Sequence, residues 1–404
     1  MQVEAYIMPL CLRFRLVSVK MYMKEVQSMP TERRLENQST ELSESCERSL
    51  QEIGLILPLI VTTAIMSPLA PDVDIKKNIA LDVDIPKLYE FDQVWYNRIF
   101  SELIEEIYPL HLNIYTDGSK LENGSTAAAF YIPEFKTVTT YLLHPSHTVL
   151  GAELRAIKMA LEFILETHSH SQQPVLILTD SKSALQLITQ LRPSYKGIIY
   201  KIHEIIKVYQ GEIRFQWVKA HIGVKGNEVA DKAAKQAHLN DRTLREGLEQ
   251  EESFGCLNSG FLSLWTTLWR QEVNSSGKGR FIMEIYSDIK SRPWQQHKNR
   301  TIECAAARLR IGHAGVNKHL FRFNMKEHEI CDHCEEEETI QHFLLSCPKY
   351  NNTRETLKNR MQFLNVPLSV KNILGGANVS RVIQFKITQA LSKFLASTGR
   401  AATL

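Results

Sequence analysis

HLNIYTDGSKLENGSTAAAFYIPEFKTVTTYLL, residues 111–143, is the stretch that decides the fold. It contains three short apolar runs, HLNIYTD, TAAAFYI and KTVTTYLL, which are separated by connections that contain Gly or Pro. Runs of this kind pair with their neighbours along the chain when the turns between them are tight. The stretch therefore predicts three antiparallel strands.

The chain that follows predicts alternating helices and strands. Residues 151–165 carry apolar side chains at helical spacing: Leu154, Ile157, Leu161 and Ile164. VLILTD, residues 175–180, is a continuous apolar run that is typical of a strand buried on both faces. The other expected elements are helices at 183–191, at 197–209 and from Asn227, and a strand at 212–218. The predicted fold class is α/β, with a five-stranded mixed sheet in the order β-β-β-α-β-α-β-α and mainly helical N- and C-terminal regions on either side.

Composition and charge suggest three regions. The chain has 404 residues, of which 44% are hydrophobic and 23% are charged, and this excludes a collagen-like or wholly disordered protein. The net charge is −6 for residues 1–107, +3 for residues 108–240 and +6 for residues 241–404. We expect helical segments and a polar linker at 31–50 in the first region, the α/β domain in the second, and a basic, mainly helical third region.

Signals for secretion or membrane insertion are weak. The uncharged run from Ile53 to Pro71 is interrupted by three prolines and two threonines, which favours a buried or partner-facing segment over a membrane-spanning helix. No charged segment precedes an apolar core at the N-terminus, so no signal peptide is expected. Seven cysteines in 404 residues exclude a disulfide scaffold. We expect an intracellular protein, nuclear or cytoplasmic, that is neither secreted nor attached to a membrane.

Four acidic residues fall at strand ends and helix starts. Asp117 and Asp180 close the first and fourth strands, Glu153 opens the first long helix, and Asp231 lies in the first turns of the last helix. Such positions meet at one edge of an open α/β sheet. Each acid alone could instead be a turn former or a partner of a helix dipole. Together they predict a site in which two Mg²⁺ or Mn²⁺ ions, about 4 Å apart, offset the repulsion among the carboxylates.

Residues 111–237 resemble a type 1 ribonuclease H domain. The motifs IYTDGS, GAELRAI, LTDSKSAL and WVKAHIGVKGNEVADKAA occur in the family's order. The resemblance implies endonucleolytic hydrolysis of the RNA strand of RNA–DNA hybrids by two-metal-ion catalysis. It also implies that Asp117 bridges both ions, that Glu153 and Asp180 complete the site of one, and that Asp231 helps to hold the ion that binds the attacking water.

The same resemblance assigns further roles around the four acids. His221 matches a loop histidine that assists proton transfer or product departure, and a histidine can exchange protons near neutral pH. An exposed loop histidine without a catalytic role is the alternative. The resemblance also places Gly118, Ser119 and Glu153 near the ribose 2′-hydroxyl, the group that distinguishes RNA from DNA.

A second group of chemical interest lies at residues 331–347. Its members, Cys331, Cys334, His342 and Cys347, follow the pattern C-x2-C-x7-H-x4-C. Four soft ligands without an open position are typical of one structural Zn²⁺ ion, although buried free thiols are the alternative. Residues 351–404 carry a net charge of +7, and they form either a solvated surface or a contact for phosphates.

A wider resemblance extends over most of the chain. RLRIGHAGVNKHLFRF (308–323) and CDHCEEEETIQHFLLSCPKY (331–350) resemble the C-terminal region of non-LTR, Jockey-like retrotransposon polyproteins, and residues 4–70 resemble the tail that follows their polymerase. The resemblance implies that the partners are an RNA–DNA hybrid and a reverse transcriptase or retroelement ribonucleoprotein. The competing hypothesis is a catalytically idle remnant that binds nucleic acid or a protein through its basic, zinc-containing C-terminal region. The intact set of acids and His221 favour the nuclease.

Overall fold

The computed structural model describes residues 8–28, 41–54, 79–80, 93–167, 172–190, 194–237, 246–286, 289 and 299–404. These residues form two compact units, one made of Arg15–Asn258 and one made of Met1–Phe14 with Ser259–Leu404. The division into regions 1–107, 108–240 and 241–404 stays a prediction. Within the described ranges, no helix combines the length and the apolar character needed to cross a membrane, and most of the run 53–71 lies outside them.

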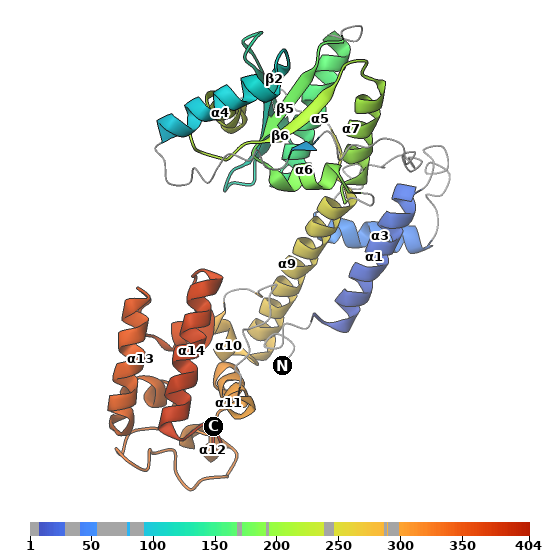
Figure 1. The fold of residues 1–404 in the computed structure, drawn as a ribbon. Helices are drawn as coiled ribbons and strands as arrows, with labels where there is room; N and C mark the ends of the chain where they lie inside the picture. Colours follow the sequence, from blue (N-terminus) through green and yellow to red (C-terminus); the bar gives the residue numbers. More distant parts are fainter. Residues whose placement is uncertain are drawn as a thin grey trace. The chain divides into compact units, whose positions relative to one another are not determined.

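A mixed sheet forms the centre of the unit Arg15–Asn258 (Figure 1). In the described part of the chain its strand order is β1-β6-β5-β2-β3-β4. The strands are β1 (Ile79–Ala80), β2 (Leu112–Lys120), β3 (Thr126–Ile132), β4 (Thr137–Leu143), β5 (Val175–Thr179) and β6 (Ile213–Trp217). β3 is antiparallel to β2 and β4, whereas β5 is parallel to β2 and β6. The predicted five-stranded mixed sheet is confirmed. The structure adds the edge strand β1, which the sequence did not predict because two residues are too few to show an alternating strand pattern.

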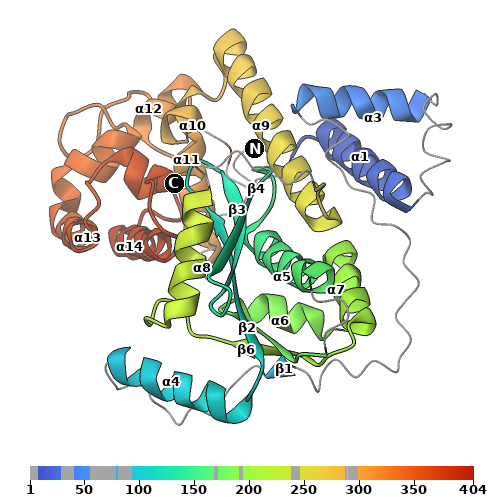
Figure 2. The ribbon, with the colours of Figure 1, turned by 90° about the horizontal axis from the view of Figure 1, so that it is seen from above.

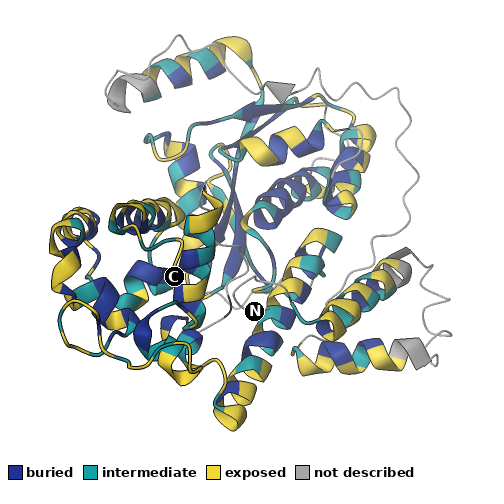
Figure 3. Ribbon diagram, turned by 90° about the horizontal axis from the view of Figure 1, so that it is seen from below, coloured by how far each residue is buried: buried dark blue, intermediate teal, exposed yellow. Residues whose placement is uncertain are grey.

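Helices cover both faces of this sheet (Figure 2). One face carries α5 (Val149–Thr167), α6 (Lys182–Ile188) and α7 (Lys196–Val208), and the other carries α4 (Gln93–Ile107) and α8 (Lys225–Gln236). β5 is buried on both faces, as its continuous apolar run predicted. Val175 and Ile177 belong to the core beneath α5, while Leu176 and Leu178 pack with Phe100 of α4. In Figure 3 most of β2, β3 and β5 is accordingly coloured as buried.

Two helices in the N-terminal part are α1 (Leu10–Ser28) and α3 (Glu41–Glu52). The expected linker at 31–50 is wrong for residues 41–50, which belong to α3. Cys46 and Leu50 are one helical turn apart and both are buried. A narrow apolar stripe of this kind is sufficient to pack a helix whose other faces are polar, so the Ser- and Glu-rich composition was misleading.

The unit that contains Ser259–Leu404 is mainly helical, as expected for the C-terminal region. Its core includes residues from α11 and α14 and the first and last cysteines of the 331–347 cluster. The elements from residue 250 onward are α9 (Gln250–Ser276), α10 (Arg280–Ile285), α11 (Arg300–Ile311), α12 (Asn317–Arg322), η5 (His342–Ser346), η6 (Pro348–Tyr350), α13 (Asn351–Phe363), η7 (Asn372–Gly376) and α14 (Arg381–Thr398).

Gly118 allows β2 to approach α5 very closely. A Cβ atom at this position would lie 2.4 Å from the backbone nitrogen of Glu153 and 2.7 Å from the carbonyl carbon of Ala152. Because both are backbone atoms, a side chain here could be accommodated only if the helix itself moved. The absence of a side chain at Gly118 therefore sets the distance between the central strand and the helix that carries Glu153.

We predict that Gly118→Ala lowers the free energy of unfolding by about 1–3 kcal/mol, the usual cost of overpacking a well-packed interior. Urea or thermal unfolding measures the change. Gly255→Ala is the matched control, because no atom lies within 4 Å of a Cβ at this position in α9. Alanine in a helix is favoured over glycine, so the control should be neutral or up to about 1 kcal/mol more stable. Wild-type stability for Gly118→Ala would contradict the close packing.

Candidate active site and metal centre

Three acidic side chains converge at one edge of the sheet. Asp117 and Asp180 directly follow Thr116 of β2 and Thr179 of β5, which are paired in the parallel ladder. The close approach of α5 at Gly118 brings in Glu153. Asp117, Glu153 and Asp180 each place one carboxylate oxygen within 4.8 Å of the others. The structure thus brings together three of the four acids that the sequence predicted.

Burial and mutual repulsion make it costly to ionise these acids. Asp117 is 5% exposed and Glu153 is 6% exposed. Burial, together with repulsion from Asp180 and Asp231, raises the pKa of Asp117 to about 7. Burial, followed by the charges of Asp117 and Asp180, raises the pKa of Glu153 well above its ordinary value. Burial also raises the pKa of Asp180, although a hydrogen bond from Asn227 opposes the increase. Ionisation of the group is therefore disfavoured, and bound protons or cations would relieve the repulsion.

The donor set fits a hard divalent cation. The backbone N–H of Gly118 donates to the Glu153 carboxylate, but Glu153 Oε2 is buried and has no hydrogen-bond partner within the described residues. A buried acceptor without a donor is costly. An ion among three carboxylates would both satisfy this oxygen and offset the repulsion, and oxygen ligands are those that Mg²⁺ and Mn²⁺ prefer.

Asp231 lies outside the group of three. It belongs to α8, and its carboxylate pairs with Lys235 one helical turn later, with Nζ 2.7 Å from Oδ1. It is still close enough to Asp117 to raise the pKa of that carboxyl. The structure therefore places Asp231 within electrostatic range of the three-carboxylate group, with Lys235 as its immediate partner.

His221 is an exposed residue of the connection between β6 and α8. Its backbone has a φ of 55°, in the left-handed region, and Gly223 nearby has a φ of 83°. The charge of His221 opposes the burial-driven rise in the pKa of Asp180, so His221 lies within electrostatic range of the site. The two other predicted contacts to substrate, Gly118 and Ser119, are both buried residues of β2 beside Asp117.

Asn227 is a site residue that the sequence analysis missed. It is 2% exposed, and its Nδ2 donates to Asp180 Oδ2 at 3.2 Å. Asn227 precedes Asp231 by four residues in the same motif, and residues at this spacing lie on one face of a helix. That spacing was the signal that could have identified it. Trp217 Nε1 donates to the backbone oxygen of Asp180 at 3.0 Å, so this aspartate is fixed at both its side chain and its main chain.

A buried ionic network anchors the N-terminal end of α5. Glu252 accepts hydrogen bonds from the Thr148 backbone N–H and from Arg155, and it contacts His147 Nδ1 at 3.0 Å. Burial alone would raise its pKa, but His147 and Arg155 lower the pKa of Glu252 to about 2. Glu252 lies beyond the predicted domain end at residue 240. The helix that carries Glu153 is therefore held by a residue that none of the motifs contains.

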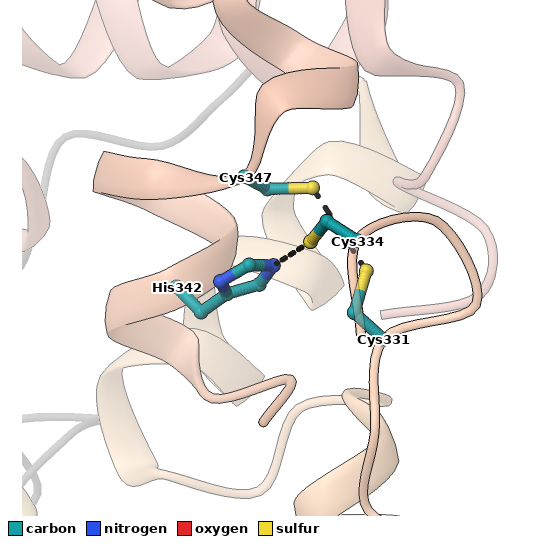
Figure 4. Close-up of side chains that lie close together, drawn as sticks. All are labelled: Cys331, Cys334, His342 and Cys347. Carbon is teal, nitrogen blue, oxygen red and sulfur yellow. Dashed lines mark hydrogen bonds between the residues drawn. The ribbon is translucent and has the colours of Figure 1, made fainter. Parts of the chain in front are cut away.

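The four members of the second group also come together, as Figure 4 shows. Their ligand atoms all lie within 4.8 Å of one another. Cys331 Sγ is 3.9 Å from Cys347 Sγ, and Cys334 Sγ is 3.2 Å from His342 Nε2. Two sulfurs at about 2.3 Å from one tetrahedral ion are about 3.8 Å apart, so the spacing fits Zn²⁺.

The surroundings of this cluster also fit a metal. His342 Nδ1 lies 3.0 Å from Glu336 Oε2, which directs the other ring nitrogen toward the cysteines. Carboxylates commonly orient metal-binding histidines in this way. Burial and the neighbouring thiols raise the pKa of Cys347 to about 11, which disfavours a free thiolate there. A bound Zn²⁺ ion would stabilise the thiolate form with its positive charge, since Zn²⁺ binds cysteine as the thiolate.

Comparison with known proteins identifies relatives of the unit Arg15–Asn258. A family model described as RNase H matches residues 110–238. The protein named Ribonuclease H of Tropheryma whipplei is 32% identical over 142 residues, which cover 32% of this chain and 84% of that protein. Ribonuclease H of Saccharomyces cerevisiae is 27% identical over 161 residues, with 32% and 46% covered. The Pol polyprotein of equine infectious anemia virus is 34% identical over 158 residues, and the match spans 37% of this chain but only 12% of the viral protein.

We predict that the metal-free protein loses stability as pH rises toward 7. The pKa of Asp117 in the folded state, about 7, lies above the value of about 4 for an unfolded aspartate. Its stabilising contribution is therefore complete below about pH 4 and is lost by about pH 7, with an upper bound of about 4 kcal/mol. Urea unfolding in Mg²⁺-free buffer at about pH 5 and about pH 8 measures it. Asp117→Asn should flatten this pH dependence, and an unchanged dependence would contradict the raised pKa.

A metal measurement tests the cysteine cluster. Purified protein should contain about one equivalent of zinc, and Cys334→Ser should release it, because a tetrahedral site needs all four ligands. Cys304→Ser is the control, since Cys304 is a free cysteine of the same unit that lies outside the cluster. Elemental analysis gives the zinc content and thermal unfolding gives the order of the region. A zinc-free protein with an intact unfolding transition for this unit would refute the site.

Proposed function

The chain belongs to the ribonuclease H family through residues 110–238, and from this membership we propose that it hydrolyses the RNA strand of RNA–DNA hybrids by internal cleavage. The observation that carries the proposal is the convergence of Asp117, Glu153 and Asp180 within 4.8 Å. Two buried carboxylates and a half-buried one, placed so close that their charges raise the pKa values of Asp117 and Glu153, do not favour stability of the fold. They are suited to concentrating divalent cations where a phosphodiester is cut.

We assign Asp117, Glu153, Asp180 and Asp231 to hold two Mg²⁺ or Mn²⁺ ions. When bound, these ions would supply the activation of water and the stabilisation of charge on the leaving oxygen. Other groups of the chain position the carboxylates that would hold the ions. Asn227 fixes the Asp180 carboxylate, and the Gly118 N–H fixes one oxygen of Glu153.

Recognition of the RNA strand and proton movement are assigned to residues around the acids. Gly118, Ser119 and Glu153 are proposed to contact the ribose 2′-hydroxyl, which only RNA offers. The exposed residue His221 is proposed to transfer a proton during cleavage or product departure. Its place on a loop beside Asp180 supports this role, because a proton carrier must reach both the site and solvent.

We further propose an origin in a non-LTR, Jockey-like retrotransposon, with a reverse transcriptase or retroelement ribonucleoprotein as partner. The similarity to a retroviral Pol polyprotein supports a polymerase context. In this proposal residues 1–107 derive from the region after the polymerase, 108–240 are the nuclease and 241–404 carry the zinc cluster. The second candidate function is nucleic-acid or protein binding by a catalytically idle remnant. The cysteine cluster and the basic segment 351–404 favour it.

Cleavage of a labelled hybrid in Mg²⁺ by the purified chain tests the nuclease. We predict that Asp117→Asn abolishes this cleavage while the protein remains folded, because the substitution removes a central ligand and relieves repulsion. Glu166→Gln is the matched control, since Glu166 is an exposed acid at the far end of α5 and should retain full activity. Wild-type cleavage by folded Asp117→Asn protein would refute the site. Absence of cleavage by the wild-type chain would favour the idle remnant.

His221→Ala should slow cleavage without eliminating it. Positioned proton transfer contributes about 10²-fold or somewhat more, whereas the charged transition state depends on the cations. Single-turnover rates in Mg²⁺ measure the chemical step separately from substrate binding and product release. His328→Ala, an exposed histidine outside the site, is the control. A loss as complete as that of Asp117→Asn would give His221 a larger role than proposed here.

A further inference from the structure

A groove lies between α13 and α14 in the unit that contains Ser259–Leu404. Figure 1 shows the two helices side by side. The groove has a volume of about 460 Å³, and its lining includes the buried side chains of Leu357 and Phe394. Its lining also includes Thr356, Arg360 and Phe363 from α13, and Gln389, Lys393 and Ser397 from α14. Leu357 and Phe394 thus form a buried apolar floor, and most of the other lining residues are polar or cationic.

The charge of the groove has a single sign. Arg360 stands on one helix and Lys393 on the other, and none of the described residues that line the groove is acidic. Lys386 lies seven residues before Lys393, and this spacing places both lysines on one face of α14. The only acid among residues 351–404, Glu355, does not line the groove and lies 4.0 Å from Lys358. A polyanion is therefore the ligand class whose charge complements the groove.

An exposed aromatic ring stands at one end of the groove. Phe363 is 74% exposed, and the Arg360 guanidinium carbon lies 5.4 Å from the centre of its ring. An aromatic face and a planar guanidinium are the two surfaces on which unpaired bases stack. In a duplex the bases already stack on one another, so this pair of groups suits a single strand.

We propose that the groove between α13 and α14 binds single-stranded nucleic acid. Arg360 and Lys393 contact phosphates from opposite walls, and Phe363 stacks against a base. Thr356, Gln389 and Ser397 supply hydrogen bonds to sugar or base edges, while the apolar floor excludes water beneath the strand. The site is separate from the acids of the ribonuclease H domain, and the proposal does not rest on hybrid cleavage.

Fluorescence anisotropy with the full chain tests the proposal. The probes are labelled oligo(U) and oligo(dT) of about 12 nucleotides, a length within the usual range for single-strand sites. Phe363→Ala should weaken binding by about ten-fold, the typical effect of losing one stacked base. Lys393→Glu should weaken binding at low salt and reduce the slope of log affinity against log salt by about 0.7 or more, since at least one phosphate contact is lost. Comparison of the two probes shows whether RNA is preferred.

Two matched variants control for non-specific effects. Phe323→Ala removes another exposed ring of the same unit, and Lys371→Glu makes the same charge change outside the groove. Both should stay within about two-fold of wild type, and thermal unfolding should be unchanged for all four variants. The proposal is overturned by wild-type protein that binds neither probe, or by binding that is insensitive to Phe363→Ala and Lys393→Glu. Self-association that depends on Phe363, with unchanged oligonucleotide affinity, would also overturn it and assign the groove to a second copy of the chain.

Discussion

The candidate active site depends on the close packing of β2 between two helices. Gly118 admits the backbone of α5, and a Cβ at Gly226 of α8 would lie 2.1 Å from the ring of Tyr115 in β2. Glycine at these two contacts brings both helices against the central strand. Because Glu153 belongs to α5 and Asp231 belongs to α8, this packing determines how near each acid comes to Asp117. The electrostatics of the site follow from a steric constraint.

The site is built at a cost in electrostatic energy that other parts of the domain help to offset. Backbone and side-chain donors partly compensate the acids, through the Gly118 N–H to Glu153 and Asn227 to Asp180. The salt network of Glu252 and Arg155 then fixes the start of α5, so that repulsion among the carboxylates is resisted by a firmly held helix. A rigid frame of this kind keeps ligand oxygens in place, which is what a site for hard cations requires.

Helix α13 contacts the segment that carries the cysteine cluster and also lines the groove. Arg354, in the first turn of α13, is buried and donates to the carbonyl oxygens of Leu344 and Cys347. These carbonyls belong to the segment that also carries His342 and Cys347. The same helix forms one wall of the groove. Arg354 therefore links the backbone of the cysteine cluster to the helix that lines the groove.

The sequence by itself determined the five-stranded sheet, because the strands and amphipathic helices have clear periods, and motifs in a fixed order predicted that the four acids form a site. Only the tertiary structure showed that Asp231 pairs with Lys235 outside the group of three, that Asn227 holds Asp180, and that Glu252 anchors α5. The edge strand β1 and the helical state of residues 41–50 also emerged only there. The physical reason is the same throughout. The period of apolar residues shows which face of a helix or strand is buried. Contacts between residues far apart in the chain depend instead on how closely the elements pack and on the local charges.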